Sequence, residues 1–314
     1  MRGAYCYLPI LSARGGAFRA VSRLSPLTRS RLTPQRFGSR AIPVTGTEAD
    51  RGQEYLNTIR GLMARGTEGV CLRFARDELD EPKLLRSSIE SLLKYLEVSP
   101  AMVDVVFDFR YVGRDRVESL RATTLEALQA IHGIGPFRNV TVAGSSMPDV
   151  LNKRDQGKVR REARVELDLW FQVVTTFADS VAIALGDYGV VGAHHVPPSD
   201  HVYVPSRVRY TTSSEHVIRR AKPNEYPEIC RQLVDTEDFL GPNFSVGDQN
   251  MKNSAMGLTG PGNPAIWVAS DTNHHLELVS AQAWSVLQQH GLDDRFALAV
   301  PKAHPWLQPE LLDV

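Results

Sequence analysis

The chain lacks most of the features that mark specialised classes of protein. Its 314 residues include 3 cysteines, Cys6, Cys71 and Cys230, which are odd in number and too far apart for a Cys-x-x-Cys metal knuckle. No run of about 18 apolar residues occurs, so the sequence predicts no membrane-spanning helix and no membrane partner. Because sparse cysteines are typical of a reducing compartment, we expect a cytoplasmic protein.

An excess of charge of either sign is also absent. The 36 basic and 36 acidic side chains cancel, which argues against binding of nucleic acid by bulk electrostatics, since phosphate contacts need a basic excess. Only 7 of the 36 basic residues are lysine. The arginine excess fits either repeated bidentate contacts with anions or a base-composition bias of the genome. Residues 1–47 hold 8 arginines and no acidic residue, as a transit peptide does, but the apolar run at 5–11 predicts a strand there.

The common cofactor motifs are missing as well. No Gly-x-Gly-x-x-Gly follows the first predicted strand and no P-loop pattern occurs, so neither dinucleotide nor P-loop binding has support. The adjacent His274 and His275 lack the spacing of two to five residues that zinc ligands usually have. Neighbouring side chains also point in different directions on a strand or a helix, so we expect only one of these histidines in a given site. The sequence therefore predicts no metal and no cofactor.

The chain does contain a regular alternation of apolar runs and amphipathic segments. The apolar runs are nearly continuous, which is typical of parallel strands covered on both faces. A single (β/α)8 TIM-like barrel over 1–314 fits this α/β pattern better than a doubly wound sheet, with a basic segment at 1–47 and long loops at 191–207 and 241–265. The predicted strands are 5–11, 41–44, 70–74, 102–111, 137–143, 181–185, 208–212 and 266–268, and the predicted helices 18–24, 54–64, 82–98, 117–131, the second half of 155–177, 226–234 and 281–290.

Polar residues occur where the predicted strands end, and in a barrel these ends meet at one mouth, where ligands bind. Acid and base groups form the predicted catalytic set, Asp108, Asp187, His274 and His275. Arginines that can hold an anion, with aromatic and amide neighbours, form the predicted ligand-binding set, Arg14, Arg73, Arg209, Tyr188, Tyr210, Asn273 and Trp267.

A structural interpretation stays open for several of these residues. Asp108 also fits a carboxylate that pairs with a neighbouring arginine inside the fold. The segment 187–189 fits a turn, in which Asp is favoured for its local hydrogen bonds. Arg209 fits a solvated strand residue, and 245–248 fits the start of a helix.

Several segments, in order along most of the chain, resemble the phage T4-type beta protein family of phages and bacterial defence islands. The resemblance implies a barrel-like fold and a phage-related role, and no settled activity. The first 45 or so residues depart from it, because 33–38 lacks the family's acidic, apolar pattern. The similar segments are Tyr7-Leu8-Pro9-Ile10-Leu11 with Arg14-Gly15, Gly186-Asp187-Tyr188-Gly189, Val208-Arg209-Tyr210-Thr211, Phe244-Ser245-Val246-Gly247-Asp248, and Thr259-Gly260-Pro261-Gly262-Asn263-Pro264 through Trp267 to Thr272-Asn273-His274-His275.

Two functions follow as hypotheses. In the first, the barrel binds or hydrolyses a phosphorylated or nucleotide-like anion at its carboxyl-terminal face. In the second, it is a non-catalytic recognition component of a phage defence or counter-defence system that presents its long loops to a protein partner. The residues alone leave open whether the protein is an enzyme.

Overall fold

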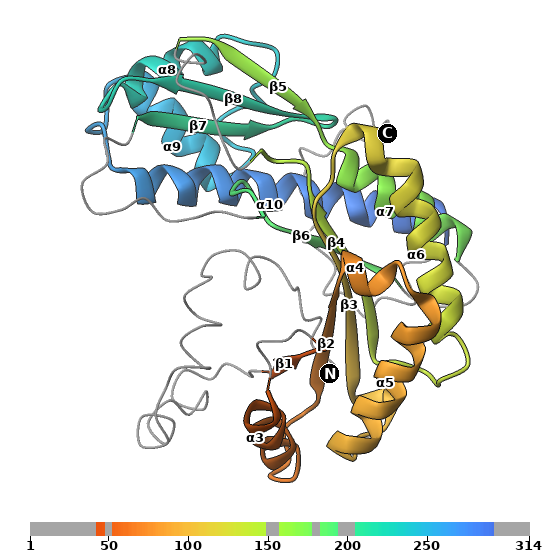
Figure 1. The fold of residues 1–314 in the computed structure, drawn as a ribbon. Helices are drawn as coiled ribbons and strands as arrows, with labels where there is room; N and C mark the ends of the chain where they lie inside the picture. Colours follow the sequence, from red (N-terminus) through yellow and green to blue (C-terminus); the bar gives the residue numbers. More distant parts are fainter. Residues whose placement is uncertain (1–41, 48–51, 149–156, 178–182, 194–204, 292–314) are drawn as a thin grey trace.

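The computed structural model describes residues 42–47, 52–148, 157–177, 183–193 and 205–291 (Figure 1). The predicted strand at 5–11, the predicted helix at 18–24, Arg14 and most of the predicted loop at 191–207 lie outside the described residues.

A five-stranded parallel sheet forms the centre of the larger part of the molecule. Its strands lie side by side in chain order, so their carboxyl ends share one edge of the sheet. The β-branched and aromatic runs predicted as strands form it, and the weak prediction at 41–44 corresponds to the short first strand. The strands are β1 (Val44–Thr45), β2 (Val70–Ala75), β3 (Val103–Tyr111), β4 (Asn139–Ser145) and β6 (Ile183–Asp187).

Helices pack their apolar sides onto one face of this sheet. Alternate strand residues such as Leu72, Phe74 and Phe107 join the helices in the main apolar core, whereas Cys71 and Val106 belong to a small separate cluster. The helical elements are α3 (Gln53–Met63), α4 (Arg76–Leu79), α5 (Pro82–Leu96), η2 (Pro100–Met102), η3 (Arg114–Arg116), α6 (Val117–Ile131) and α7 (Val165–Thr176).

The α/β class is confirmed, and the described strands form an open sheet rather than a closed barrel. The predicted strand at 208–212 is not a sixth parallel strand. It is β7 (Ser206–Thr211), and a tight turn in which Thr212 N–H donates to Glu215 O at 2.8 Å returns the chain at once as β8 (Glu215–Ala221). So short a connection allows only antiparallel pairing. With β5 (Val159–Ala163) these strands form a second sheet in the order β5-β8-β7.

Three more helices cover the second sheet. They are α8 (Tyr226–Val234), α9 (Val246–Ala255) and α10 (Pro264–Gln289). The predicted long loop at 241–265 is wrong in its middle, because the Ser245 side chain accepts the Asp248 N–H at 3.1 Å and begins α9. The alternative interpretation of 245–248 as a helix start is confirmed.

The predicted strand at 266–268 is wrong, because these residues lie in the first turns of α10, the same helix that includes the predicted helix at 281–290. Asn263 accepts the N–H groups of Ala265 and Ile266 at 3.0 and 3.1 Å, and Pro264 occupies the first helical position. The Gly-Pro segment therefore leads directly into a helix.

Helix α10 joins the two parts of the molecule (Figure 1). Trp267, near its start, belongs to the apolar core beneath the antiparallel sheet, whereas Val286 and Leu287, near its end, belong to the core of the parallel sheet. Among the described helices, none combines the length and the apolar character that a membrane-spanning segment needs.

Candidate functional site

The carboxyl edge of the parallel sheet holds the polar residues of the candidate site. In the strand register Ala75 lies beside Asp108, Asp108 beside Ala143, and Gly144 beside Asp187. The acidic residues of β3 and β6 therefore reach the same edge, as the strand-end argument predicts.

Arg73, Asp108 and Tyr188, here called the Arg73 cluster, are joined through one carboxylate oxygen. Arg73 Nε donates to Asp108 Oδ2 at 2.7 Å, Arg73 Nη2 donates to the same oxygen, and the Tyr188 hydroxyl donates to it at 2.5 Å. The backbone N–H of Arg110 donates to the other oxygen, Oδ1, at 2.9 Å. Asp108 is fully buried and has donors on both oxygens, so the geometry favours a positioning role for Asp108 over proton transfer.

Burial and charge act in opposite directions on this cluster. Burial lowers the pKa of Arg73, but the Asp108 carboxylate and the Tyr188 oxygen outweigh it, so the pKa is raised. Burial and then the Asp108 carboxylate raise the pKa of the Tyr188 phenol. Arg73 is thus a fixed cation, and 19% of its side chain is exposed. It is the member of the cluster that meets solvent.

Thr211, His275 and Asp187, here called the His275 relay, form a second group at the same edge. Thr211 Oγ1 lies 2.9 Å from His275 Nδ1, and His275 Nε2 lies 3.0 Å from Asp187 Oδ1. A neutral imidazole with its proton on Nε2 satisfies both contacts, since it donates to the carboxylate and accepts the hydroxyl. The order hydroxyl, imidazole, carboxylate is that of a general-base relay. All three side chains are buried.

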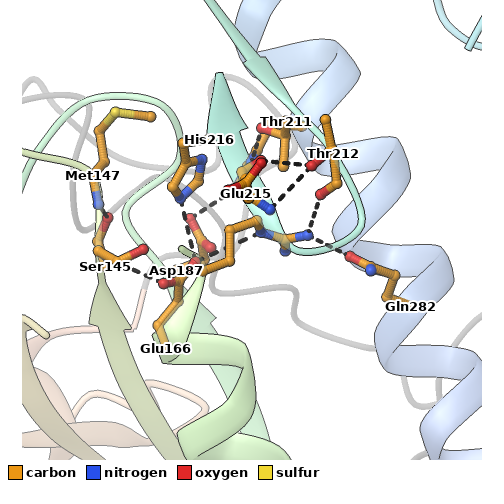
Figure 2. A network of polar contacts seen from close by, with 12 residues as sticks. Ser145, Met147, Glu166, Asp187, Thr211, Thr212, Glu215, His216 and Gln282 are labelled. Atoms are coloured by element: carbon orange, nitrogen blue, oxygen red, sulfur yellow. Dashed lines mark hydrogen bonds and ion pairs between the residues drawn. The ribbon is translucent and has the colours of Figure 1, made fainter. Parts of the chain in front are cut away.

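Glu166, His216 and Arg164, here called the Glu166 network, lie beside this relay. Figure 2 shows Glu166 of α7 and His216 of β8 close to each other. Gln282 of α10 contacts Arg164, whose Nη1 donates to Gln282 Oε1 at 2.6 Å. The His216 ring stacks on the His275 ring with centroids 5.8 Å apart, and His216 Nε2 lies 3.4 Å from Glu166 Oε1. Burial alone raises the pKa of Glu166, but His216, Arg164 and the Ser146 N–H face the carboxylate and lower that pKa to about 2.

The Glu166 network contains buried polar atoms without hydrogen-bond partners. They are His216 Nδ1, Arg164 Nε and the nearby Ser146 Oγ, while His216 Nε2 and Glu166 Oε1 face each other at 3.4 Å. Orphaned buried polar atoms are uncommon in native proteins and indicate a water, an ion or a functional demand.

His274 contacts a different carboxylate from His275, although both histidines contact Thr211. Its Nδ1 lies 2.8 Å from Asp248 Oδ2, and its Nε2 lies 2.8 Å from the backbone oxygen of Thr211. The Tyr210 ring stacks on His274 at 3.8 Å, and the Tyr210 hydroxyl donates to Asp248 Oδ1 at 2.7 Å. This group joins β7, α9 and α10 and has no partner in common with the Arg73 cluster.

The structure assigns packing or capping contacts to the other predicted ligand-binding residues that it describes. Asn273 accepts the Gly247 N–H at 2.8 Å, at the start of α9. Trp267 stacks on Tyr226 at 4.9 Å and donates to Pro261 O at 2.8 Å. Arg209 lies on the antiparallel sheet, where its nearest carboxylate oxygen is that of Asp271 at 4.0 Å. It shares no ion-pair partner with Arg73.

Sequence reasoning missed Glu166, His216, Arg164 and Thr211 as members of the site. Two of them flank or belong to elements that were not predicted, because β5 and β8 are rich in charged residues and lack an apolar run. No motif marks Glu166, His216 or Arg164, whereas Thr211 ends the segment Val208-Arg209-Tyr210-Thr211 that carries part of the family resemblance. Within the described part of the chain, no group of three or more His, Cys, Asp or Glu side chains has a geometry that holds a metal ion.

Comparison with known proteins gives one assignment. Neither the curated proteins nor the solved structures contain a match to this chain. The family model described as Beta protein matches residues 35–281, well over half of the sequence, and the matched range includes both sheets and most of α10. The chain therefore belongs to the Beta protein family.

Proposed function

We propose that this protein binds an anionic, phosphorylated or nucleotide-like ligand at the carboxyl edge of its parallel sheet, with Arg73 as the anion contact. The observation that carries the proposal is the geometry of Arg73. Its Nε and Nη2 are held by Asp108 and Tyr188, while no hydrogen bond in the described part of the chain uses Nη1. A guanidinium held in place and partly exposed can accept an anion at little further entropic cost.

The backbone conformation beside Arg73 also supports a ligand site at this edge of the sheet. Arg110 has φ 57°, in the left-handed region that non-glycine residues seldom adopt, and its N–H is tied to Asp108. The register between β3 and β4 shifts at this point. Strained residues of this kind concentrate at ligand sites.

Binding is favoured over hydrolysis. The His275 relay has the order of groups that activates a hydroxyl, but Thr211 and His275 are fully buried. A hydrolytic role requires that a substrate or a water molecule reach His275. If one does, Asp187 and His275 serve as the acid and base pair. We propose a phage-related or defence-associated setting on the resemblance alone.

Thermal shift followed by calorimetry against nucleotides and sugar phosphates tests the proposal. We expect at least one ligand to stabilise the wild type, and Arg73→Gln to weaken its binding by tenfold or more because the fixed cation is lost. Arg116→Gln removes an exposed arginine from the same part of the chain and should bind as the wild type does.

Arg73→Lys addresses the case in which Arg73→Gln fails to fold. It keeps a cation beside Asp108 but lacks the planar fork, so we expect a folded protein with weaker binding. The proposal fails if no ligand shifts the wild type, or if a folded Arg73 variant binds as tightly as Arg116→Gln.

The recognition hypothesis also has an observation in its favour. Met256, Leu258 and Ile266, around the connection from α9 to α10, are large apolar side chains exposed to solvent. In affinity capture, a partner that is lost with Met256→Ser/Leu258→Ser but retained with Arg73→Gln supports this function. If both variants capture an identical set of partners, the recognition hypothesis loses its support.

A further inference from the structure

A cavity lies away from the Arg73 cluster, where the end of β8 and the start of β5 meet α8. Its volume is about 440 Å³, within the range of small-molecule sites. None of its lining residues belongs to the Arg73 cluster, the His275 relay or the Glu166 network. The charged residues that line it are Lys158, Arg219, Arg220, Lys222, Glu225 and Glu228.

The lining carries more positive than negative charge. Four of these six side chains are basic and two are acidic. Both carboxylates are also engaged, since Glu228 accepts from Arg231 Nη2 at 2.7 Å and Glu225 accepts the Lys222 N–H at 2.9 Å. Neither Lys158, Lys222 nor Arg219 forms an ion pair within the described residues.

Arg219 is the unusual member of the group. It is only 7% exposed, and its Nε has no hydrogen-bond partner. Its direct neighbours across the sheet are Val159 and Val208, which are apolar. The charge of Asp238 favours the charged form of Arg219, but Asp238 is itself paired with Arg161. A buried guanidinium with an unsatisfied Nε is costly, and native proteins retain one where another group satisfies it.

Further basic side chains at this end of the sheet increase the positive potential. Arg207 lies directly opposite Arg220 in the β7 and β8 register. Burial, followed by the charges of Arg209 and Arg220, lowers the pKa of Arg207 to about 10. The cluster repels another cation and favours an anion.

We propose that this cavity is a second binding site, for a phosphate-bearing ligand of about nucleotide size, with Arg219 as its buried anchor and Lys158 and Lys222 at its rim. The Arg219 guanidinium matches the geometry of a phosphate, and the two lysines add charge without a fixed orientation. The site is independent of the function proposed above.

Calorimetric titration with inorganic pyrophosphate tests the site, in an Arg73→Gln background that removes the other anion contact. We expect saturable binding that weakens as salt increases. Adding Arg219→Gln should weaken it by at least tenfold and Lys222→Gln by several-fold, whereas Arg116→Gln leaves it unchanged. The proposal is overturned if the Arg73→Gln protein shows no saturable binding, or if Arg219→Gln and Lys222→Gln bind as the control does.

The melting temperature without ligand provides a second readout. If Arg219 is kept for an anion, its removal relieves a buried guanidinium whose Nε is unsatisfied, and Arg219→Gln should match or exceed the melting temperature of its parent. A clear fall in that temperature with unchanged pyrophosphate affinity assigns Arg219 a structural role and contradicts the proposal. Lys222 is exposed, so Lys222→Gln tests binding even if Arg219→Gln does not fold.

Discussion

His274 and His275 are neighbours in the chain, yet their ring nitrogens meet different hydrogen-bonding groups. Both contacts of His274 are acceptors, a backbone carbonyl and the Asp248 carboxylate, so two protons must lie on or between these groups. An imidazolium beside a carboxylate and a neutral imidazole beside a carboxylic acid both satisfy these contacts. His275 meets a hydroxyl that can donate, and a neutral ring satisfies it. Of the two, His275 is suited to accept a proton.

Asp271 provides a pH-dependent prediction at the scale of single residues. It is fully buried, and its Oδ1 has no hydrogen-bond partner, while Oδ2 accepts the Arg209 N–H at 2.9 Å. Burial raises the pKa of Asp271 to about 8, against the opposing effect of Arg209. The folded protein thus keeps a proton that the unfolded chain loses above pH ~4.

The raised pKa makes the folded protein less stable as pH increases from about 4 to about 8, by about 1.4 kcal/mol per pH unit from this group alone. Asp271→Asn keeps the acceptor and removes the ionisation. We expect it to unfold at higher urea than the wild type at pH 8 and at similar urea near pH 4. Asp235→Asn, at an exposed position, is the control. A difference between Asp271→Asn and the wild type that is constant across pH contradicts the prediction.

At the scale of elements, α10 is the helix on which most of the polar contacts depend. It contributes His274 and His275 to two networks, Asn273 to the start of α9, and Gln282 to the contact with Arg164. Its polar side is buried because α9 and β7 pack against it along the first half of its length. The close approach of α9 depends on a glycine.

Replacing that glycine should separate the two helices. A Cβ at Gly247 would lie 2.1 Å from the backbone oxygen of Ser270 in α10, which cannot move aside as a side chain can. We expect Gly247→Ala to destabilise the protein by about 1–3 kcal/mol in urea unfolding. Gly61→Ala in α3 is the matched control, because its Cβ would meet only the flexible end of Arg65 at 3.6 Å. Better helix propensity should make that variant more stable by about 0.5–1 kcal/mol. Similar losses in both variants would show that close packing at Gly247 is not the cause.

At the scale of the whole molecule, Arg164 connects the two sheets. It lies between β5 and α7, and its Nη1 donates to the backbone oxygens of Thr212 and Ser213 and to Gln282 Oε1 at 2.9, 3.2 and 2.6 Å. Its removal leaves these acceptors and the Glu166 carboxylate without their buried cation. Breaking a buried charged contact of this kind costs about 3–5 kcal/mol.

Two buried thiols report on the two parts separately, Cys71 on β2 and Cys230 on α8. In a Cys6→Ser background, thiol labelling in dilute urea should modify both at one rate, because α10 and Arg164 make unfolding cooperative. Arg164→Gln should label Cys230 faster than Cys71.

Arg161→Gln is the control, since it breaks two partly exposed pairs, with Glu215 and Asp238, each worth about 0–1 kcal/mol. Unequal rates in the wild type, or equal rates in Arg164→Gln, would show that Arg164 does not couple the two sheets.

The strand-end argument predicted part of the candidate site. Parallel strands end at a common edge, so knowing where the strands lie was enough to place four residues there. These residues are Arg73, Asp108, Asp187 and Tyr188. The roles of Asn273 and Trp267 were not foreseen, since a helix cap and a ring stack depend on which segments meet across the fold. His216 and Glu166 have no local pattern, because only the crossing of α7, β8 and α10 brings them together.

The sequence by itself determined the alternation of strands and helices, the bounds of elements such as Tyr226–Val234, and the parallel arrangement of the larger sheet. These features follow from apolar periodicity and turn chemistry, which act over a few neighbouring residues. Only the tertiary structure decided that β7 and β8 leave the parallel sheet, that α10 begins at Pro264, and that the adjacent histidines pair with different carboxylates. Each of these depends on a cap, a tight turn or a buried partner far away in the chain, and the free energy of such contacts is absent until the chain has folded.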